Sequence, residues 1–241
     1  MVIQLENSYR AFIKKLVFSK KAKCRNLLDK AKVLQRVQDA GIVAVVRGES
    51  KEEAYKTAKA CIKGGVGGIE LAFTAPNADE VIGKLNEEYA DDPNVLIGAG
   101  TVLDPATARV AIIAGARFIV SPSFSEDVAK ICNLYTIPYI PGCMTPTDIQ
   151  NALSLGADII KLFPGSIVGS SMVSEIHGPF PQAKLMITGG VRLDNLSEWF
   201  EKGAKIVGVG GQMVGPASKG DYDQVTQNAG AFKAEIDKIL N

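Results

Sequence analysis

Two charged residues interrupt short apolar runs, where charges are rare. Glu70 lies in one such run and Lys161 in another, each with a bulky aliphatic residue on either side. Side chains of a β-strand point alternately to opposite faces, so each charge would point away from its apolar neighbours. A charge on the inner face of a packed sheet is costly unless it is paired or performs chemistry.

A lysine in apolar surroundings suits one kind of chemistry. It is poorly solvated and gives up its proton more readily, and the free amine can attack a ketone to form an imine. A facing carboxylate can move the protons that this reaction requires. Lys161 and Glu70 therefore predict imine-based cleavage or formation of a carbon–carbon bond, without a metal. The alternatives are a buried salt bridge, or a lysine that reaches the surface.

Histidine and cysteine usage limits other chemistries. A Ser-His-Asp or Cys-His hydrolase would have to use His177, the one histidine, and a site with several histidine ligands is impossible. We expect a surface or packing role for it. Four cysteines form no CxxC pair, which favours reduced thiols and a cytoplasmic chain. We expect no metal and no cofactor.

Strand-like and helix-like segments alternate along most of the chain. Eight short runs read as strands, at 41–47, 68–73, 95–101, 117–121, 137–142, 158–163, 184–188 and 205–210. Helical segments between them include 51–63, 78–89, 106–114, 127–134, 147–155 and 193–202. Eight strand–helix units in 241 residues predict a single α/β domain, a parallel (β/α)₈ TIM barrel. The alternative is a doubly wound open sheet, which would usually show fewer units and a glycine-rich first turn.

The barrel would bring the two charges together. Its second and sixth strands are diametrically opposed, and these strands carry Glu70 and Lys161. Two long side chains reaching inward from opposite walls could meet directly or through a water. This placement favours a working pair over a structural salt bridge.

Glycine pairs end the last two strands of the predicted barrel. They are Gly189-Gly190 after Thr188, and Gly210-Gly211. Exposed backbone N–H groups at these strand ends form the usual phosphate site of a barrel. The alternative is that the glycines only allow tight turns.

Other polar and small residues end the first four strands. Arg47 could hold a substrate carboxylate through its fork of donors, or it could cap a loop. Thr101 and Thr188 could donate hydroxyls to a substrate or to local carbonyls. Ser121 and Pro122 would leave room at the barrel mouth for a compact substrate.

The overall charge of +1 gives no reason to expect a nucleic-acid partner. The charge is unevenly distributed, because residues 1–36 hold ten basic side chains and two acidic ones. Residues 1–25 predict a basic amphipathic helical extension, and 26–241 the barrel domain. The extension could bind an anionic surface, but we favour a helix that covers one end of the barrel. A second helix around Val33 and Val37 would lead into the first strand. No apolar run is long enough to span a membrane.

Eight stretches in order make residues 33–214 resemble the 2-keto-3-deoxy-6-phosphogluconate (KDPG) and 2-keto-4-hydroxyglutarate (KHG) aldolases. These are 42–47 (IVAVVR), 68–73 (GIELAF), 97–102 (IGAGTV), 118–122 (FIVSP), 140–145 (IPGCMT), 160–164 (IKLFP), 178–181 (GPFP) and 188–191 (TGGV). Each is weak alone, and together they are specific. The resemblance implies a homotrimeric class I aldolase, a lyase of carbohydrate metabolism that releases pyruvate.

Residue roles follow from the resemblance position by position. Lys161 matches the Schiff-base lysine and Glu70 the general acid/base. The remaining matches concern substrate binding: Arg47 for the carboxylate, Thr101, Thr188 and Pro122 for the pocket, and Gly189, Gly190 and Gly211 for the phosphate. The products would be pyruvate and glyceraldehyde 3-phosphate, or pyruvate and glyoxylate from the hydroxyglutarate substrate.

The chain departs from the family pattern at three positions. Thr74 stands where some members carry arginine, Gln212 where some carry serine, and Ile187 where many carry proline. By the resemblance, the first two positions lie where the charge of the substrate would be read. Two other functions stay open at this point, a phosphosugar isomerase or epimerase and a non-catalytic ligand-binding barrel.

Overall fold

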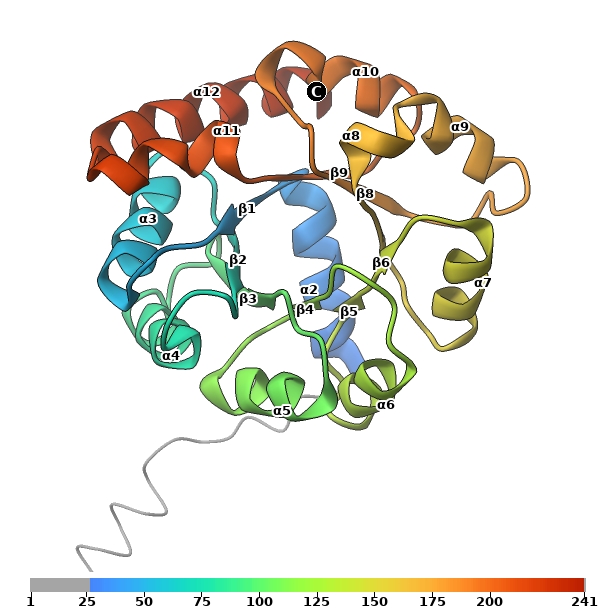
Figure 1. Ribbon diagram of the computed structural model, residues 1–241, viewed down its shortest axis with the longest axis horizontal. Coiled ribbons are helices and arrows are strands. Elements are labelled where there is room, and N and C mark those ends of the chain that lie inside the picture. The colour runs from blue at the N-terminus through green and yellow to red at the C-terminus, as the bar shows by residue number, and fades with distance from the viewer. Residues whose placement is uncertain (1–26, 241) are drawn as a thin grey trace, which may run out of the picture.

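A computed structural model describes residues 27–240 of the chain as a ring of parallel strands inside a ring of helices (Figure 1). The strands are β1 (Ile42–Val46), β2 (Gly68–Ala72), β3 (Leu96–Gly100), β4 (Ile119–Val120), β5 (Tyr139–Ile140), β6 (Gly142–Cys143), β7 (Ile160–Leu162), β8 (Leu185–Thr188) and β9 (Ile206–Val209). The predicted extension over residues 1–25 lies outside the described part, so its helical character stays a prediction.

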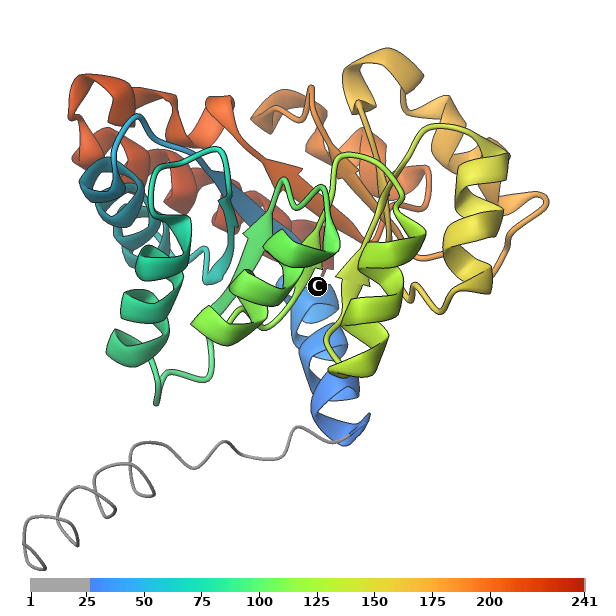
Figure 2. The same cartoon turned by 60° about the horizontal axis from the view of Figure 1, so that its bottom comes forward.

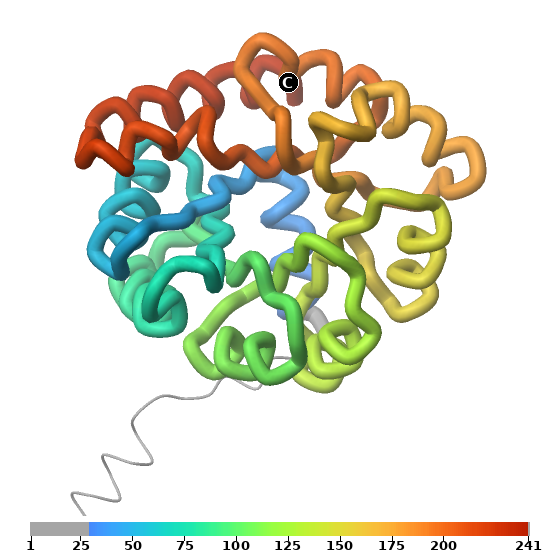
Figure 3. The backbone as a smooth tube through the Cα atoms, in the orientation of Figure 1, coloured from blue at the N-terminus to red at the C-terminus, as the bar shows by residue number. Residues whose placement is uncertain are grey.

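The smooth trace of Figure 3 shows the helices surrounding the sheet, except the first, which precedes β1 and lies in the middle of the ring in this view. They are α2 (Leu27–Ala40), α3 (Lys51–Lys63), α4 (Ala78–Glu88), α5 (Pro105–Ala114), α6 (Glu126–Leu134), α7 (Pro146–Ser154), α8 (Gly165–Val168), α9 (Ser171–His177), α10 (Leu196–Glu201), α11 (Gly211–Val214) and α12 (Tyr222–Leu240), with short 3₁₀ turns η1 (Leu193–Asn195) and η2 (Gly215–Lys219). None of these described helices is long and apolar enough to cross a membrane.

The strand order confirms the barrel and excludes the open sheet. Neighbours run β5-β4-β3-β2-β1-β9-β8-β7-β6, and all pairs are parallel. β5 and β6 are halves of one predicted strand, separated by Pro141, which has no N–H to donate. The carbonyl of Pro141 still accepts a hydrogen bond from the Lys161 backbone at 2.9 Å. The ring therefore closes through this interrupted strand.

Local sequence signals set the helix boundaries. Ser50, Asp104, Ser125 and Thr145 each accept a hydrogen bond from the first turn of the helix that follows. Gly115 ends α5 with φ of 103°, a conformation that glycine adopts without steric cost.

Two apolar cores lie on either side of the sheet. The larger core packs the outer face of the strands against the helices, and it includes Ile69, Leu71, Ile160 and Leu162. The smaller core fills the inside of the barrel at one end, with Val43, Leu96, Phe118, Val120, Ile140, Ile159, Met186 and Ile206. Val33 and Val37 of α2 belong to this core, and Figure 2 shows α2 under this end of the ring of strands. The open end of the barrel is therefore the opposite one, at the carboxyl ends of the strands.

Candidate active site

Glu70 and Lys161 meet inside the barrel. β2 and β7 are opposite each other, because three strands separate them in either direction when β5 and β6 count as one. The Nζ atom of Lys161 lies 3.5 Å from Oε1 of Glu70. Glu70 is 1% exposed and Lys161 is 4% exposed. The structure thus brings together the two charges that strand alternation placed on the inner face.

The surroundings of the pair leave it incompletely satisfied. Oε2 of Glu70 is buried and has no hydrogen-bond partner within residues 27–240. The ring of Phe163 lies 5.1 Å from the Lys161 amine, and the inner apolar core lies below it. A buried ion pair repays its desolvation only when further hydrogen bonds complete it. This pair is held by one long contact, and Oε2 stays free to bind a ligand or a water.

Thr188 adds a third polar group to the same end of the barrel. It is the last residue of β8 and is paired in register with Gly208 on β9. Its side chain is 7% exposed, and Oγ1 has no hydrogen-bond partner among the described residues. A buried hydroxyl without a partner is rare in a folded protein. Thr188 therefore has the properties of a ligand-binding group.

The other predicted pocket residues lie at the strand ends. Arg47 is exposed directly after β1, Thr101 is half-buried directly after β3, and Pro122 is half-buried two residues after β4. Thr101 has φ of 54°, which is uncommon for a residue other than glycine and marks a constrained loop. All three follow the carboxyl ends of parallel strands, the face that carries barrel active sites.

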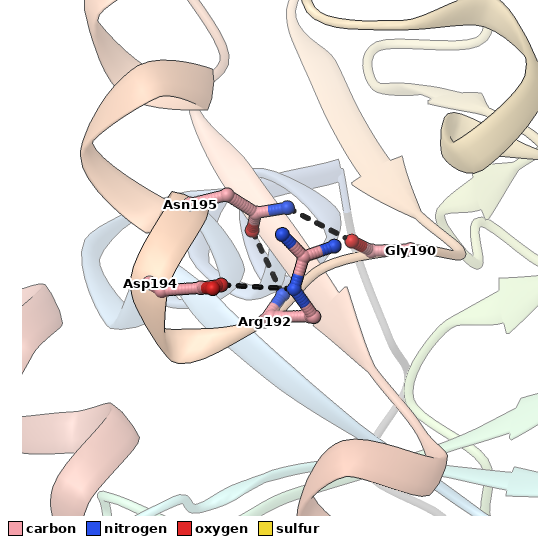
Figure 4. Close-up of polar contacts among 4 residues, drawn as sticks. All are labelled: Gly190, Arg192, Asp194 and Asn195. Carbon is pink, nitrogen blue, oxygen red and sulfur yellow. Dashed lines mark hydrogen bonds and ion pairs between the residues drawn. The ribbon is translucent and has the colours of Figure 1, made fainter.

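The loop after β8 is tightly organised. Gly189 and Gly190 have φ of 89° and 77°, so side chains there would be strained. The Asn195 amide donates to the Gly190 carbonyl at 3.0 Å and accepts from the Arg192 backbone at 2.8 Å (Figure 4). Asp194 accepts a hydrogen bond from Nε of Arg192 at 2.9 Å. These contacts fix the shape of the glycine loop.

Arg192 is a candidate for binding the substrate phosphate that sequence reasoning missed. Its guanidinium is anchored through Nε and lies beside Gly190 in Figure 4. Its side chain is 51% exposed. A permanent positive charge two residues after a glycine pair is the signal that could have indicated it.

Gly211 begins α11 after β9 and is exposed. A Cβ at this position would meet nothing within 4 Å, and its φ is not positive. Neither backbone strain nor packing within the described chain requires glycine here, and the phosphate contact expected of Gly211 stays a prediction.

His177 and the described cysteines lie outside the site. The Nε2 atom of His177 is 3.0 Å from the carbonyl of Ala183, so the packing role is confirmed. Cys61, Cys132 and Cys143 are free and buried. Burial raises the pKa of each of these thiols from 9.0 to about 12, which keeps them protonated and unreactive. Between residues 27 and 240, no histidine, cysteine and carboxylate side chains cluster as metal ligands would.

Comparisons with known proteins agree with this geometry. The sequence model for the KDPG and KHG aldolases matches residues 33–228. A 2-dehydro-3-deoxy-phosphogluconate aldolase of Treponema pallidum is 37% identical over 198 residues, which cover 80% of this chain and 92% of that protein.

Two solved structures share the fold. One is a KDPG aldolase from Legionella pneumophila with pyruvate captured as a covalent carbinolamine, with a TM-score of 0.75 and 28% identity over 84% of this chain and 97% of that chain. The other is a porous protein cage designed by fusing symmetric oligomeric domains, with a TM-score of 0.77 and 27% identity over 83% of this chain and 73% of that chain. The chain belongs to the KDPG and KHG aldolase family.

Proposed function

We propose that the chain cleaves KDPG to pyruvate and glyceraldehyde 3-phosphate through a Schiff base on Lys161. The observation that carries this proposal is the Lys161 amine, 4% exposed, facing the Glu70 carboxylate at 3.5 Å inside the barrel. The carbinolamine captured in the related Legionella pneumophila structure supports the same chemistry, because a carbinolamine precedes an imine. The family match makes the isomerase and the non-catalytic barrel the weaker functions.

The reaction begins at the substrate ketone. The lone pair of the Lys161 nitrogen attacks C2, and the carbinolamine takes up one proton from solvent and loses water to leave an iminium. The bond between C3 and C4 then breaks, and its electron pair moves into the iminium to give an enamine. Glu70 takes the proton of the C4 hydroxyl as the aldehyde forms, directly or through a water.

The second half of the reaction regenerates the enzyme. Glu70 returns its proton to C3 of the enamine, which restores the iminium of pyruvate. Water adds to C2 and one proton returns to solvent, and collapse of the resulting carbinolamine releases pyruvate and the free amine of Lys161. Every proton taken up is returned, so no cofactor is needed.

The residues at the barrel mouth divide the substrate between them. Arg47 would bind the C1 carboxylate, and the Thr188 hydroxyl, buried without a partner, would contact the reacting end with Thr101 and Pro122 beside it. The backbone N–H groups of Gly189, Gly190 and Gly211 would bind the phosphate. KHG, with a carboxylate in place of the phosphorylated end, is the second substrate that we propose, and it would yield glyoxylate.

Reductive trapping tests the chemistry directly. Incubation with pyruvate and borohydride should attach one reduced pyruvyl group, and peptide mass spectrometry should locate it on Lys161. Lys161→Met should abolish both the adduct and turnover. Lys30→Met, which removes a lysine at the closed end of the barrel, should retain both. An adduct on another lysine, or none, would refute the mechanism.

We also propose that the chain assembles as a homotrimer through the side that carries α5 and α6. Large apolar side chains are exposed there, at Leu103, Val110, Ile113 and Leu134, with Met144 before α7. An exposed apolar patch of this kind marks an association surface. Light scattering should give three times the chain mass, and Val110→Glu with Ile113→Glu should give a monomer. A native monomer at micromolar concentration would contradict this assembly.

A further inference from the structure

Gly100 lies at the end of β3, against the side chain of Glu70. β2 and β3 pair in register, with Glu70 opposite Gly98 and Ala72 opposite Gly100. A Cβ at Gly100 would lie 2.4 Å from both Cγ and Oε1 of Glu70 and 2.8 Å from Cδ. The φ of Gly100 is not positive, so the backbone conformation does not require glycine. The requirement is for space, and Glu70 occupies that space.

We propose that Gly100 is a positioning residue for the Glu70 carboxylate. Without a side chain on Gly100, the carboxylate lies against β3, with Oε1 3.5 Å from the Lys161 amine and Oε2 buried without a partner in the described chain. This inference rests on the proposed role of Glu70 in proton transfer. Gly100 itself carries no group that could transfer a proton; it acts through Glu70.

The geometry gives the size of the effect. Ordinary contact between carbon and a carboxylate requires about 1 Å more than the space at Gly100 allows, and Glu70, at 1% exposure, cannot turn out to solvent. An alanine here therefore moves the carboxylate by about 1 Å. Misplacement of a reacting group by this distance lowers a rate by about 100-fold.

Two other glycines are control positions that distinguish an effect on the place of the Glu70 carboxylate from an effect on packing. Gly98 is on the same strand and face, and a Cβ there would meet the Phe118 ring at 2.5 Å, in the inner apolar core. Gly98→Ala therefore disturbs the fold rather than the carboxylate. A Cβ on Gly83, in α4, would have the Ala114 carbonyl oxygen as its nearest neighbour, at 3.8 Å, so Gly83→Ala displaces nothing.

The experiment measures two steps of the reaction in the full chain with pyruvate. Borohydride trapping reports imine formation at Lys161, and deuterium exchange at the pyruvate methyl group reports proton transfer. Gly100→Ala should keep trapping within about threefold of the native level and lose about 100-fold in exchange. Gly83→Ala should change neither rate, and Gly98→Ala should lower the melting temperature and reduce both rates together.

A second variant pair tests whether Glu70 transmits the effect. In a Glu70→Ala background, adding Gly100→Ala should cause no further loss of exchange. A further loss would overturn the proposal, as would exchange within threefold of native in Gly100→Ala, or parallel loss of trapping, exchange and melting temperature. Absence of trapping in the native chain would instead refute the proposed function.

Discussion

The Lys161–Glu70 pair should lower the stability of the fold, and paired substitutions can measure by how much. Both side chains are almost fully buried, and one contact of 3.5 Å joins them. Lys161→Met alone removes the positive partner and leaves a buried carboxylate, which should cost about 3–5 kcal/mol of unfolding free energy. Lys161→Met with Glu70→Met removes both charges and keeps similar side-chain lengths. The double variant should recover the loss and exceed native stability by about 1–4 kcal/mol.

Urea denaturation at one fixed protein concentration gives the required free energies, because assembly would otherwise shift the apparent stability. For a chain of this size, 1 kcal/mol corresponds to about 2–4 °C in melting temperature, so the single variant should melt about 6–20 °C lower. Lys30 provides the matched control. It pairs with Asp158 at 3.0 Å, where the carboxylate side chain is 46% exposed, so Lys30→Met should cost less than about 1 kcal/mol.

The reasoning fails if the double variant is less stable than the native chain by more than about 2 kcal/mol. That result would mean that the pair stabilises the barrel, as the buried salt bridge considered from the sequence would. A double variant at or above native stability, with no turnover, would show that the chain retains the pair for its chemistry.

Three further predictions concern the pocket and the buried thiols. Arg192→Met should raise KM for KDPG about 10–100-fold and leave KM for the unphosphorylated substrate, KHG, unchanged. The control Lys184→Met, at the opposite rim of the barrel, should change neither KM. Equal effects of Arg192→Met on both substrates would exclude a contact between Arg192 and the phosphate. Gly208→Ala should raise KM for KDPG at least about tenfold, because the added Cβ would lie 2.3 Å from Oγ1 of Thr188 and displace that hydroxyl. A change in KM below threefold would contradict the role of Thr188 in substrate binding. In a Cys24→Ser variant, the three buried thiols should resist Ellman's reagent at about pH 8 until urea unfolds the protein. Burial raises the pKa of these thiols in the folded chain from 9.0 to about 12, so the thiols of the unfolded chain ionise first. The free energy of unfolding measured in urea should therefore fall as the pH rises through that interval.

Most of the fold could be predicted because its signals are local and repeated. Alternating strand and helix segments, glycine after helices and polar residues before them each reflect short-range backbone chemistry. Pro141 shows the limit of such patterns. It divides one predicted strand into β5 and β6, because a residue without an N–H cannot donate to the ladder, yet its carbonyl keeps the ring closed.

The site divides in the same way. Strand alternation was enough to place Glu70 and Lys161 on the inner face. Their aliphatic neighbours along each strand pack outward against the helices, so the charged side chains must point inward. Arg192 was missed because its place depends on the Asn195 and Asp194 contacts of a loop, which have no period. Gly100 was missed as a positioning residue because a glycine in a strand reads as a weak position. Its significance lies in the side chain of a neighbouring strand.

The space for a substrate arises from side chains that are absent. At the closed end, bulky residues such as Phe118 and Met186 fill the barrel, as expected for a packed core. At the open end, Gly100 and Gly208 face Glu70 and Thr188, and each lacks the Cβ that would collide with its neighbour. Packing alone would favour larger residues at both positions with smaller partners opposite. That the chain instead pairs glycine with a buried carboxylate and a buried hydroxyl, each with an unsatisfied oxygen in the described structure, indicates selection for a ligand rather than for stability.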